Sequence, residues 1–300
     1  MKRKLSNICI PLFQTTFITY TLYLISLFPP FFSSCNKEEP IPAYIHIDKI
    51  TLSTVYSNEG TNSNKIIDAW IYVDDQLLGA FELPCTVPVL ATGSHIVKVA
   101  PGVKENGISD TRIVYPFYNR YQETVTLTAG QTTTIHPTTI YSQNADFTWK
   151  EDFEGSATGT CDTVNSDTVM QVAHAPTDVF EGTGSGVVVL SGTKTGYVGV
   201  SCNAYTLPKT GTDIFLELNY NCNTDFNVGV IGYDPTNGID FQTVSLTLRP
   251  TNGWNKVYVN LTSEVNTAFN SVKFGIFFSM AKNTDLSSSW FYVDNVKLIN

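Results

Sequence analysis

Apolar and polar residues alternate with a period of two along much of the chain after residue 42, and turn-forming residues interrupt the alternation at short intervals. A period of two places successive side chains on opposite faces of a strand, so the pattern predicts β-strands with a buried face. No long helical period appears after residue 40. The predicted fold class is therefore all-β.

The first group of predicted strands lies within residues 43–141, where about seven short strands have the size of an immunoglobulin-like β-sandwich. Its connections are short, with one turn at Asp74-Asp75, which suits antiparallel pairing. After a strand that begins at Tyr44, the expected strands are Asp68–Val73, Leu77–Leu83, His95–Val99, Thr111–Tyr115, Glu123–Leu127 and Thr132–Thr139.

The second group lies within residues 147–300, where eight or more longer strands predict a jelly-roll β-sandwich. Glu217 and Asn219 alternate with apolar neighbours, which predicts a strand with one apolar and one polar face. Residues 154–182 are rich in Gly, Ser and Thr and are expected to form a loop. The expected strands are Gly186–Leu190, Tyr197–Asn203, Asp213–Tyr220, Phe226–Tyr233, Gln242–Leu248, Trp254–Asn260, Ser271–Ser279 and Trp290–Leu298.

Residues 1–34 have the order of parts of a secretory signal peptide, with a basic start, an apolar stretch and small residues before Cys35. The alternative is an uncleaved transmembrane anchor. Pro29 and Pro30 argue against it because they interrupt an apolar stretch that is already marginal against the roughly 20 residues a span needs.

The residues around Cys35 resemble a more specific signal, that of a bacterial lipoprotein. Phe32-Ser33-Ser34-Cys35 resembles a lipobox, although phenylalanine replaces the usual leucine, and Asn36-Lys37-Glu38-Glu39 resembles the export tag of Bacteroidetes-type lipoproteins. The resemblance implies that Cys35 carries acyl chains such as palmitate, and that residues 35–42 tether the protein to the outer membrane, facing the cell exterior. Two or more acyl chains anchor firmly, since each buried CH₂ contributes about 0.8 kcal/mol.

The amino-acid composition limits the classes of molecule that the protein is expected to bind. With 42% hydrophobic and 12% aromatic residues the chain can bury sizeable cores. Its formal net charge is −9, and loss of the basic residues 2–4 with the signal peptide makes the remainder more acidic. An acidic protein of this kind is a poor partner for nucleic acid, so no nucleic-acid binding is expected.

Four cysteines remain after the signal peptide and the lipidated residue, namely Cys85, Cys161, Cys202 and Cys222. Outside the cytoplasm they can form disulfides, and a Cys202–Cys222 bridge is the pairing we expect, with two buried free thiols as the alternative. No Cys/His spacing suggests zinc.

Each predicted sandwich also resembles a known family. Residues 69–74, 78–79, 93–99 and 125–131, together with Pro84 and Pro88, resemble a PEGA-type surface sandwich, which implies a spacer without catalysis. Residues 152–154, 254–261 and 291–298 resemble the jelly rolls of carbohydrate-binding modules and galactose-binding-like domains. That fold serves as glycan binder, spacer or adhesion module.

The second resemblance implies a structural Ca²⁺ held by Asp152, Glu154 and Asp294, which match the family's acidic positions on the first and last strands. Carboxylate oxygens suit Ca²⁺, and backbone carbonyls would complete the six to eight ligands it needs. The alternative is that Asp294 only caps local backbone groups.

Sugar binding in such modules relies on exposed aromatic rings that stack on the sugar and on nearby polar side chains that bond to its hydroxyls. Trp254 and Phe291 lie in alternating apolar strands and are expected in the core. The predicted ligand-binding residues, which lie nearer loops or strand ends, are Tyr205, Tyr233, Asp234, Arg249 and Trp290.

The main hypothesis is a noncatalytic lipoprotein whose jelly roll binds glycan or another surface ligand. The alternative is a structural or adhesion scaffold that binds partner proteins, and a hydrolase is third because the sequence contains none of the HExxH, GxSxG, P-loop or dinucleotide-binding motifs.

Overall fold

A computed structural model describes residues 39–236, 240–268 and 270–300. The predicted signal peptide and Cys35 lie outside the described residues, so the lipid anchor stays a prediction. Residues Pro42–Asn300 form one compact unit. Within the described ranges, no helix has the length and apolar character needed to cross a membrane.

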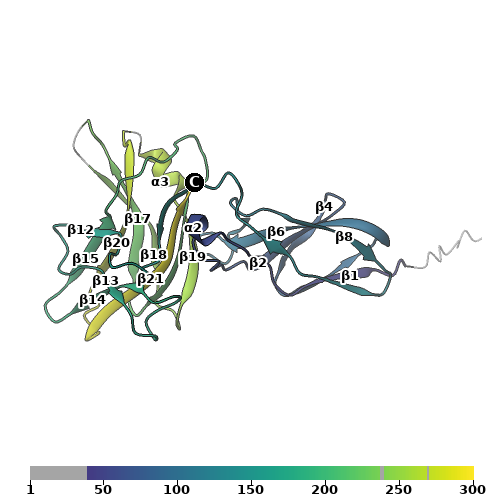
Figure 1. Cartoon of the computed structure of the whole chain (residues 1–300), viewed down its shortest axis with the longest axis horizontal. Helices are drawn as coiled ribbons and strands as arrows, with labels where there is room; N and C mark the ends of the chain where they lie inside the picture. The colour runs from purple at the N-terminus through teal and green to yellow at the C-terminus, as the bar shows by residue number, and fades with distance from the viewer. Residues whose placement is uncertain (1–38, 237–239, 269) are drawn as a thin grey trace, which may run out of the picture. The chain divides into compact units, whose positions relative to one another are not determined.

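The first sandwich is built from two small sheets, of whose strands β1, β4, β6 and β8 are labelled in Figure 1. A two-stranded ladder of β2 and β10 and a one-turn helix, α2, accompany it. The strands of one sheet, in spatial order, are β5 (Cys85–Val89), β1 (Ala43–Ile47) and β9 (Thr132–Ile135). The other sheet contains β4 (Gln76–Glu82), β3 (Asp68–Val73), β6 (Gly93–Lys104), β7 (Arg112–Val114) and β8 (Tyr121–Leu127). The remaining elements are β2 (Thr51–Leu52), α2 (Tyr56–Glu59) and β10 (Thr138–Thr139).

The buried side chains of the first sandwich are those that the alternating pattern predicted. Ala69, Ile71 and Val73 of β3 are buried, while the residues between them are partly exposed. Asp74 and Asp75 both adopt positive φ (48° and 66°), which is the backbone that a two-residue hairpin turn requires. The predicted turn between β3 and β4 is therefore confirmed.

Two features of the first sandwich differ from the expectation. β1 pairs in parallel with β9, and β2 pairs in parallel with β10, whereas the short connections suggested antiparallel pairing throughout. The strand β5 was not expected, because Pro88 lies within it. It is an edge strand, where a missing backbone N–H is tolerated.

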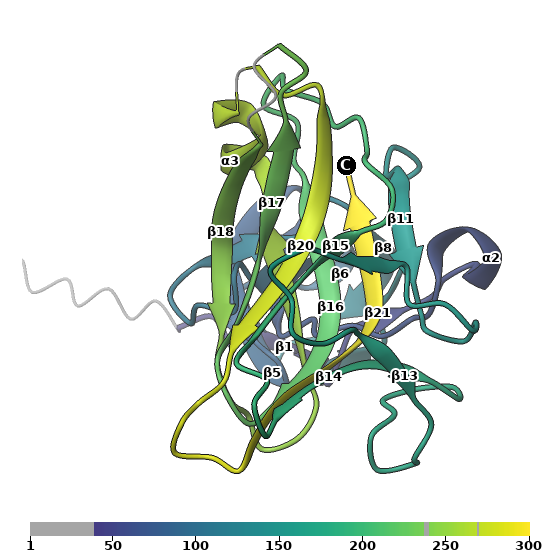
Figure 2. The same ribbon diagram turned by 90° about the vertical axis from the view of Figure 1, so that its left-hand side faces the viewer.

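The second sandwich is a jelly roll of two larger sheets, and the all-β fold is confirmed. We call them the front sheet, which faces the viewer in Figure 2, and the back sheet. A short helix, α3 (Thr262–Thr267), precedes β20. The front sheet contains, in spatial order, β12 (Thr160–Asp162), β15 (Gly196–Ser201), β20 (Lys273–Ala281), β17 (Phe226–Tyr233) and β18 (Phe241–Leu248). The back sheet contains β13 (Gln171–Ala173), β14 (Ser185–Ser191), β21 (Ser288–Ile299), β16 (Phe215–Cys222) and β19 (Asn255–Asn260), and β11 (Phe147–Glu151) also pairs with β21.

The segment 154–182, expected to be a loop, contains the strands β12 and β13. Each has only three residues, too few to show a period of two, and each extends a sheet by pairing with β15 or β14. The pairing of β12 with β15 brings Cys161 beside Cys202, and these two cysteines form the disulfide. The predicted Cys202–Cys222 bridge is wrong, because Cys222 belongs to the back sheet and is a free thiol in the core.

A buried network of charged and phenolic groups joins the two sandwiches. Glu217 of β16 has no exposed surface, and its carboxylate accepts hydrogen bonds from the hydroxyls of Tyr115 (2.9 Å) and Tyr141 (3.0 and 3.1 Å). The ammonium of Lys256 lies 3.0 Å from the same carboxylate. The polar face predicted from Glu217 and Asn219 is thus buried rather than solvated, because the first sandwich covers it.

Lys297 of β21 completes this junction. Its ammonium donates to the carbonyl oxygen of Thr61 (2.6 Å) and to the hydroxyl of Tyr141 (3.3 Å). Burial lowers the pKa of Lys297 to about 8 and raises the pKa of Tyr141 well above its usual range. These hydrogen bonds and ring contacts hold the first sandwich against the outer face of the back sheet, and the candidate sites lie on the surfaces that this contact leaves accessible.

Candidate functional site

The five predicted ligand-binding residues do not form one site. Tyr233 and Asp234 lie at one end of β17, whereas Arg249 follows Leu248, which pairs with Phe226 at the other end. The ends of β17, Phe226 and Tyr233, are seven residue steps apart, a distance of about 24 Å. Trp290 lies on the back sheet.

Trp290 belongs to a row of aromatic rings on the outer face of the back sheet. Its ring centroid lies 5.2 Å from that of Tyr292, which lies 6.2 Å from Trp254, and Trp254 lies 5.5 Å from Phe180. Phe180 is 38% exposed and the other three rings are partly exposed. These four residues are named the aromatic row.

The strand pattern explains why the row faces outward. Trp290 and Tyr292 alternate along β21 with Phe291 and Val293, both of which are fully buried in the core. Asn221 on the neighbouring β16 is in register with Tyr292 and is partly exposed, so it adds an amide beside the rings. Trp254, expected in the core, instead belongs to the row, whereas the expected burial of Phe291 is confirmed.

The backbone and a carboxylate hold the row in place. Asn223 accepts a hydrogen bond from the backbone N–H of Trp290 (2.7 Å) and donates to the carbonyl of Ser288 (2.9 Å), which fixes the start of β21. Burial and the neighbouring Asp178 carboxylate raise the pKa of the Tyr292 hydroxyl to about 12. A protonated, anchored Tyr292 therefore presents a neutral ring across the physiological range.

The outer face of the front sheet offers less aromatic surface. A Cβ at Gly275 would lie 2.8 Å from the Tyr233 hydroxyl, and one at Gly229 would lie 2.5 Å from the Phe277 ring, so both rings lie across glycines. Tyr233 is partly exposed, but Phe277 is fully buried. Tyr233 is thus a single aromatic contact rather than part of a row. Asp234 beside it accepts the backbone N–H of Thr236 (2.7 Å).

Tyr205 is not part of either surface. Its ring stacks on Trp149 at 6.2 Å, and its backbone exchanges two 2.7 Å hydrogen bonds with Phe274. It packs against the jelly-roll core.

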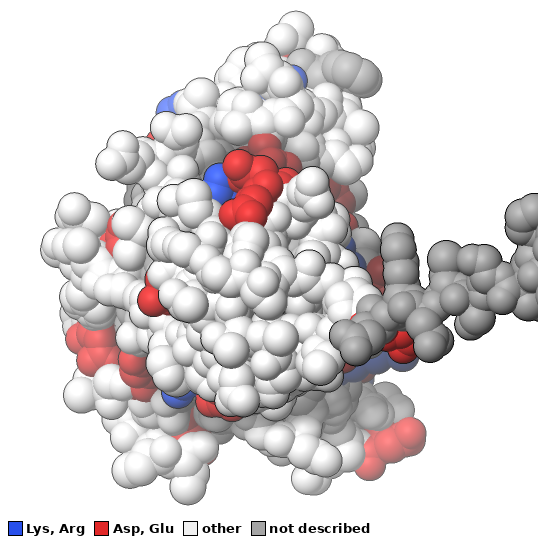
Figure 3. Space-filling view, turned by 90° about the vertical axis from the view of Figure 1, so that its right-hand side faces the viewer, with Lys and Arg blue, Asp and Glu red and all other residues white. Residues whose placement is uncertain are grey.

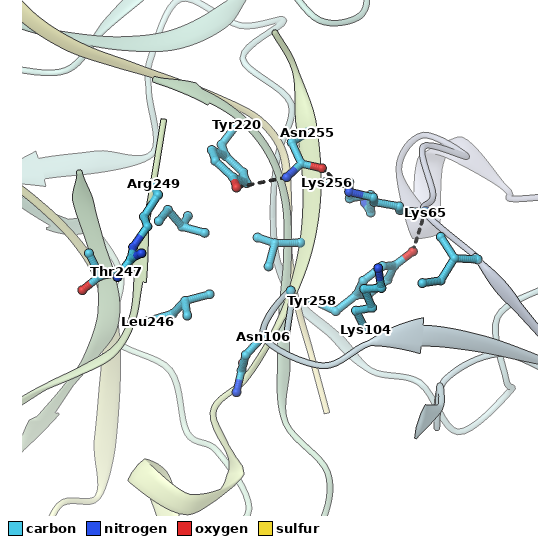
Figure 4. Close-up of a pocket in the computed structure, with 14 residues that line it drawn as sticks. Lys65, Lys104, Asn106, Tyr220, Leu246, Thr247, Arg249, Asn255, Lys256 and Tyr258 are labelled. Atoms are coloured by element: carbon cyan, nitrogen blue, oxygen red, sulfur yellow. Dashed lines mark hydrogen bonds between the residues drawn. The ribbon is translucent and has the colours of Figure 1, made fainter. Parts of the chain in front are cut away.

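Arg249 lines a cavity of about 190 Å³ between β18, β19 and the end of β6 (Figure 4). Arg249 lies on one side of the cavity, and Lys65 and Lys104 of the first sandwich lie on the other. We call it the basic cavity. Its polar lining also includes Asn106, Tyr220, Thr247, Asn255, Lys256 and Tyr258.

Hydrogen bonds fix one wall of the basic cavity. The Asn255 amide donates to the Tyr220 hydroxyl (3.0 Å) and its carbonyl oxygen accepts from the Lys65 ammonium. The backbone N–H of Lys65 donates to the Tyr258 hydroxyl (2.9 Å). Burial, with a contribution from Lys104, lowers the pKa of Lys65.

The three predicted calcium ligands are placed near one another but are satisfied by protein donors. Asp152 and Glu154 follow β11 rather than lying within a strand, and they line a second cavity of about 510 Å³ with Glu181 and Asn295. The Glu154 carboxylate accepts from the hydroxyl and backbone N–H of Thr183 (2.7 and 2.8 Å).

Asp294 is nearly fully buried below this region. Its carboxylate accepts from the Ser185 hydroxyl (2.6 Å) and from the backbone N–H of Asn295 (2.7 Å), and burial raises its pKa to about 6. In the part of the chain that the structure describes, no three His, Cys, Asp or Glu side chains are grouped closely enough to hold a metal ion. The described carboxylates therefore form no preassembled cluster for Ca²⁺, which needs six to eight oxygen ligands, and the calcium site stays a prediction.

Several residues of these sites were not predicted from the sequence. Tyr292 could have been found from its spacing of two from Trp290, which places both on one strand face. Phe180, Lys65 and Lys104 come from distant segments, and only the packed structure shows where they lie.

No protein-family model matches the chain, and no curated protein matches its sequence. Among solved structures, an N-terminal endo-1,4-β-D-xylanase module pair from Clostridium thermocellum, complexed with xylohexaose, aligns with 14% identity and a TM-score of 0.38 over 52% of this chain and 28% of that one. A carbohydrate-binding module from the β-sandwich superfamily aligns with 13% identity and a TM-score of 0.37 over 78% of this chain and 85% of that one. A family 30 carbohydrate-binding module of a Clostridium thermocellum cellulosomal cellulase aligns with 15% identity and a TM-score of 0.37 over 51% and 96% of the two chains. This chain thus spans less than a third of the xylanase chain, and none of these similarities bears on what it binds.

Proposed function

We propose that this chain is a noncatalytic, lipid-anchored surface protein whose jelly roll binds glycan through the aromatic row. The observation that carries the proposal is the row itself, three linked ring contacts from Phe180 to Trp290 on partly exposed side chains. A sugar ring has an apolar C–H face that packs on aromatic rings and hydroxyls that need amide or carboxylate partners, which Asn221 can supply.

Within this proposal, Cys35 holds the acyl chains after removal of residues 1–34, and the protein faces the exterior of the outer membrane. The first sandwich then acts as a spacer between the tether and the jelly roll. Its buried junction with the jelly roll supports this role, because a fixed spacer presents the aromatic row in a defined direction.

The alternative, a scaffold that binds partner proteins, would use the same aromatic row as a protein interface, because aromatic residues are also enriched in such interfaces. Binding of purified protein to sugar separates the two proposals.

The experiment is a glycan array followed by calorimetric titration with the full chain and its variants. Trp290→Ala and Tyr292→Ala should each weaken glycan binding roughly tenfold, because each removes a stacking ring. Phe241→Ala is the matched control, since Phe241 is 49% exposed on β18 of the front sheet and should leave binding unchanged.

Absence of saturable binding to any glycan would overturn the proposal and leave the scaffold alternative. Equal losses in Trp290→Ala and Phe241→Ala would also contradict it, because the row would then have no special part in binding. Thermal melting of each variant shows whether it is folded.

A further inference from the structure

The basic cavity has a charge that contrasts with the rest of the molecule. The chain contains 18 Lys and Arg against 27 Asp and Glu, yet four of the fourteen lining residues are Lys or Arg and none is acidic. Figure 3, which shows another face of the protein, has scattered acidic atoms and few basic ones on a largely uncharged surface. Cations are thus concentrated at the cavity against the overall composition.

Most of this positive charge has no counter-charge within the cavity. Lys256 is paired with the buried Glu217, but across residues 39–236, 240–268 and 270–300 the side chains of Lys104 and Arg249 form no hydrogen bond or ion pair. The two acids whose pKa Lys104 helps to lower, Asp68 and Glu82, are both paired with Arg112. The repulsion between Lys65 and Lys104 contributes to the lowered pKa of Lys65, and an anionic ligand would relieve it.

The walls of the cavity are held together before any ligand arrives. The backbone N–H of Asn106 donates to the Tyr258 carbonyl (2.8 Å), and the Asn106 side chain accepts from the backbone N–H of Asn260 (2.9 Å). These bonds tie the end of β6 to β19, so Lys104 and Asn255 keep their separation. A preorganised group of cations binds an anion with little ordering cost.

We propose that the basic cavity binds the carboxylate or sulfate of an acidic glycan, an inference that rests on the proposed glycan-binding function. Charged nitrogen donors form their strongest hydrogen bonds with such oxyanions. The volume of about 190 Å³ is several times the roughly 30 Å³ that one water occupies, so the cavity accommodates a group larger than a single water.

The neutral lining fits a sugar rather than a bare ion. Asn106 and Asn255 add amides that can bond to sugar hydroxyls. Asn255 also follows directly after Trp254 of the aromatic row, so the two surfaces meet at the start of β19.

The test is calorimetric titration of the full chain with a uronate oligosaccharide, a sulfated oligosaccharide, the neutral oligosaccharide of the same length and linkage, and inorganic sulfate. The acidic sugars should bind about tenfold more tightly than the neutral one, and 0.5 M NaCl should remove most of that preference. Comparison of the uronate and sulfated probes shows which oxyanion the cavity takes.

Lys104→Gln and Arg249→Gln should each weaken binding of the preferred acidic sugar about tenfold while leaving binding of the neutral sugar unchanged. Lys49→Gln is the matched control, because Lys49 is an exposed lysine of the first sandwich that does not line the cavity. Trp290→Ala should weaken binding of both the acidic and the neutral sugars.

Equal affinity for acidic and neutral sugars, or losses in the two cavity variants no greater than in Lys49→Gln, would overturn this inference and leave the proposed glycan binding intact. Failure of every oligosaccharide to bind would overturn both proposals. Saturable binding of inorganic sulfate without binding of any sugar would do the same and would identify a simple anion site.

Discussion

The outer face of the back sheet differs between its two halves, although the same strands β16 and β21 run through both. In one half Glu217 and Lys297 are buried beneath the first sandwich. Glu217 accepts hydrogen bonds from tyrosines and pairs with Lys256, and Lys297 donates to the Thr61 carbonyl and the Tyr141 hydroxyl. In the other half Trp290 and Tyr292 are partly exposed and the first sandwich does not cover them.

This contrast reverses the usual assignment of polar residues to solvent and aromatic residues to the interior. The charged half is a permanent internal contact, because a buried charge is tolerated only when it is paired and hydrogen-bonded. None of the described residues of Pro42–Asn300 buries the aromatic half completely, which makes it the half available to a ligand. The predictions below test each half in turn.

The largest effect is expected from Glu217→Gln. The substitution leaves Lys256 and Lys297 buried without their carboxylate, which should lower the free energy of unfolding by about 3 kcal/mol. Urea unfolding measures this loss. Glu123→Gln on the exposed side of β8 is the control, and a similar small change in both variants would show that the junction is not a charged network.

Lys297 makes the charged half sensitive to alkaline pH. Its pKa is about 8 in the folded protein and 10.5 in the unfolded chain, so between these values the unfolded chain holds more protons and stability rises with pH. From pH 7.5 to 9, unfolding of the unmodified chain should become about 1 kcal/mol less favourable relative to Lys297→Met.

Comparison with Lys297→Met removes the contributions of other groups. One of these is Cys222, whose thiol titrates near pH 9 in the unfolded chain, whereas burial raises its pKa to about 12 in the folded protein. Parallel pH profiles for the two proteins would contradict the assignment of a buried ammonium with a lowered pKa at this position.

The aromatic half should matter much less for folding. Trp290→Ala and Asn221→Ala remove partly exposed side chains, and each should change the free energy of unfolding by less than about 1 kcal/mol. Urea unfolding is again the measurement. A loss as large as that of Glu217→Gln would mean that the row is structural, and its part in ligand binding would then need another explanation.

The smallest effect concerns calcium. Asp294 lies on β21 between the two halves, and its carboxylate is already satisfied by Ser185 and Asn295. Millimolar CaCl₂, compared with EDTA, should therefore leave the melting temperature unchanged to within about 1 °C, whereas a bound ligand at 100 times its Kd adds about 2.7 kcal/mol. A rise of several degrees would restore the calcium prediction.

The period-two pattern was sufficient to predict the fold class and most strands, and the bounds of β3 and β17 agree with the expectation residue for residue. It failed where the pattern is too short, as in β12 and β13, or where a proline obscures it, as in β5. The pattern also could not show that the first sandwich covers Glu217. A polar position in a strand has the same hydropathy whether its side chain faces solvent or a buried polar contact.

The sites were partly predictable for a similar reason. Trp290 and Arg249 were selected because they lie near strand ends, and the structure places Trp290 in the aromatic row and Arg249 in the lining of the basic cavity. Their neighbours Phe180 and Lys104 come from segments far away in the chain, and their proximity depends on packing that no local pattern encodes.

Tryptophan fluorescence during glycan titration tests the central claim most directly, because two of the four tryptophans, Trp254 and Trp290, belong to the aromatic row and two, Trp70 and Trp149, do not. We expect a saturable emission change with the bound glycan, which disappears when Trp254→Phe and Trp290→Phe are combined even though binding measured by calorimetry persists. Saturable glycan binding with an emission change that survives this double substitution, or with none in the unmodified chain, would contradict the assignment of the row as the contact surface.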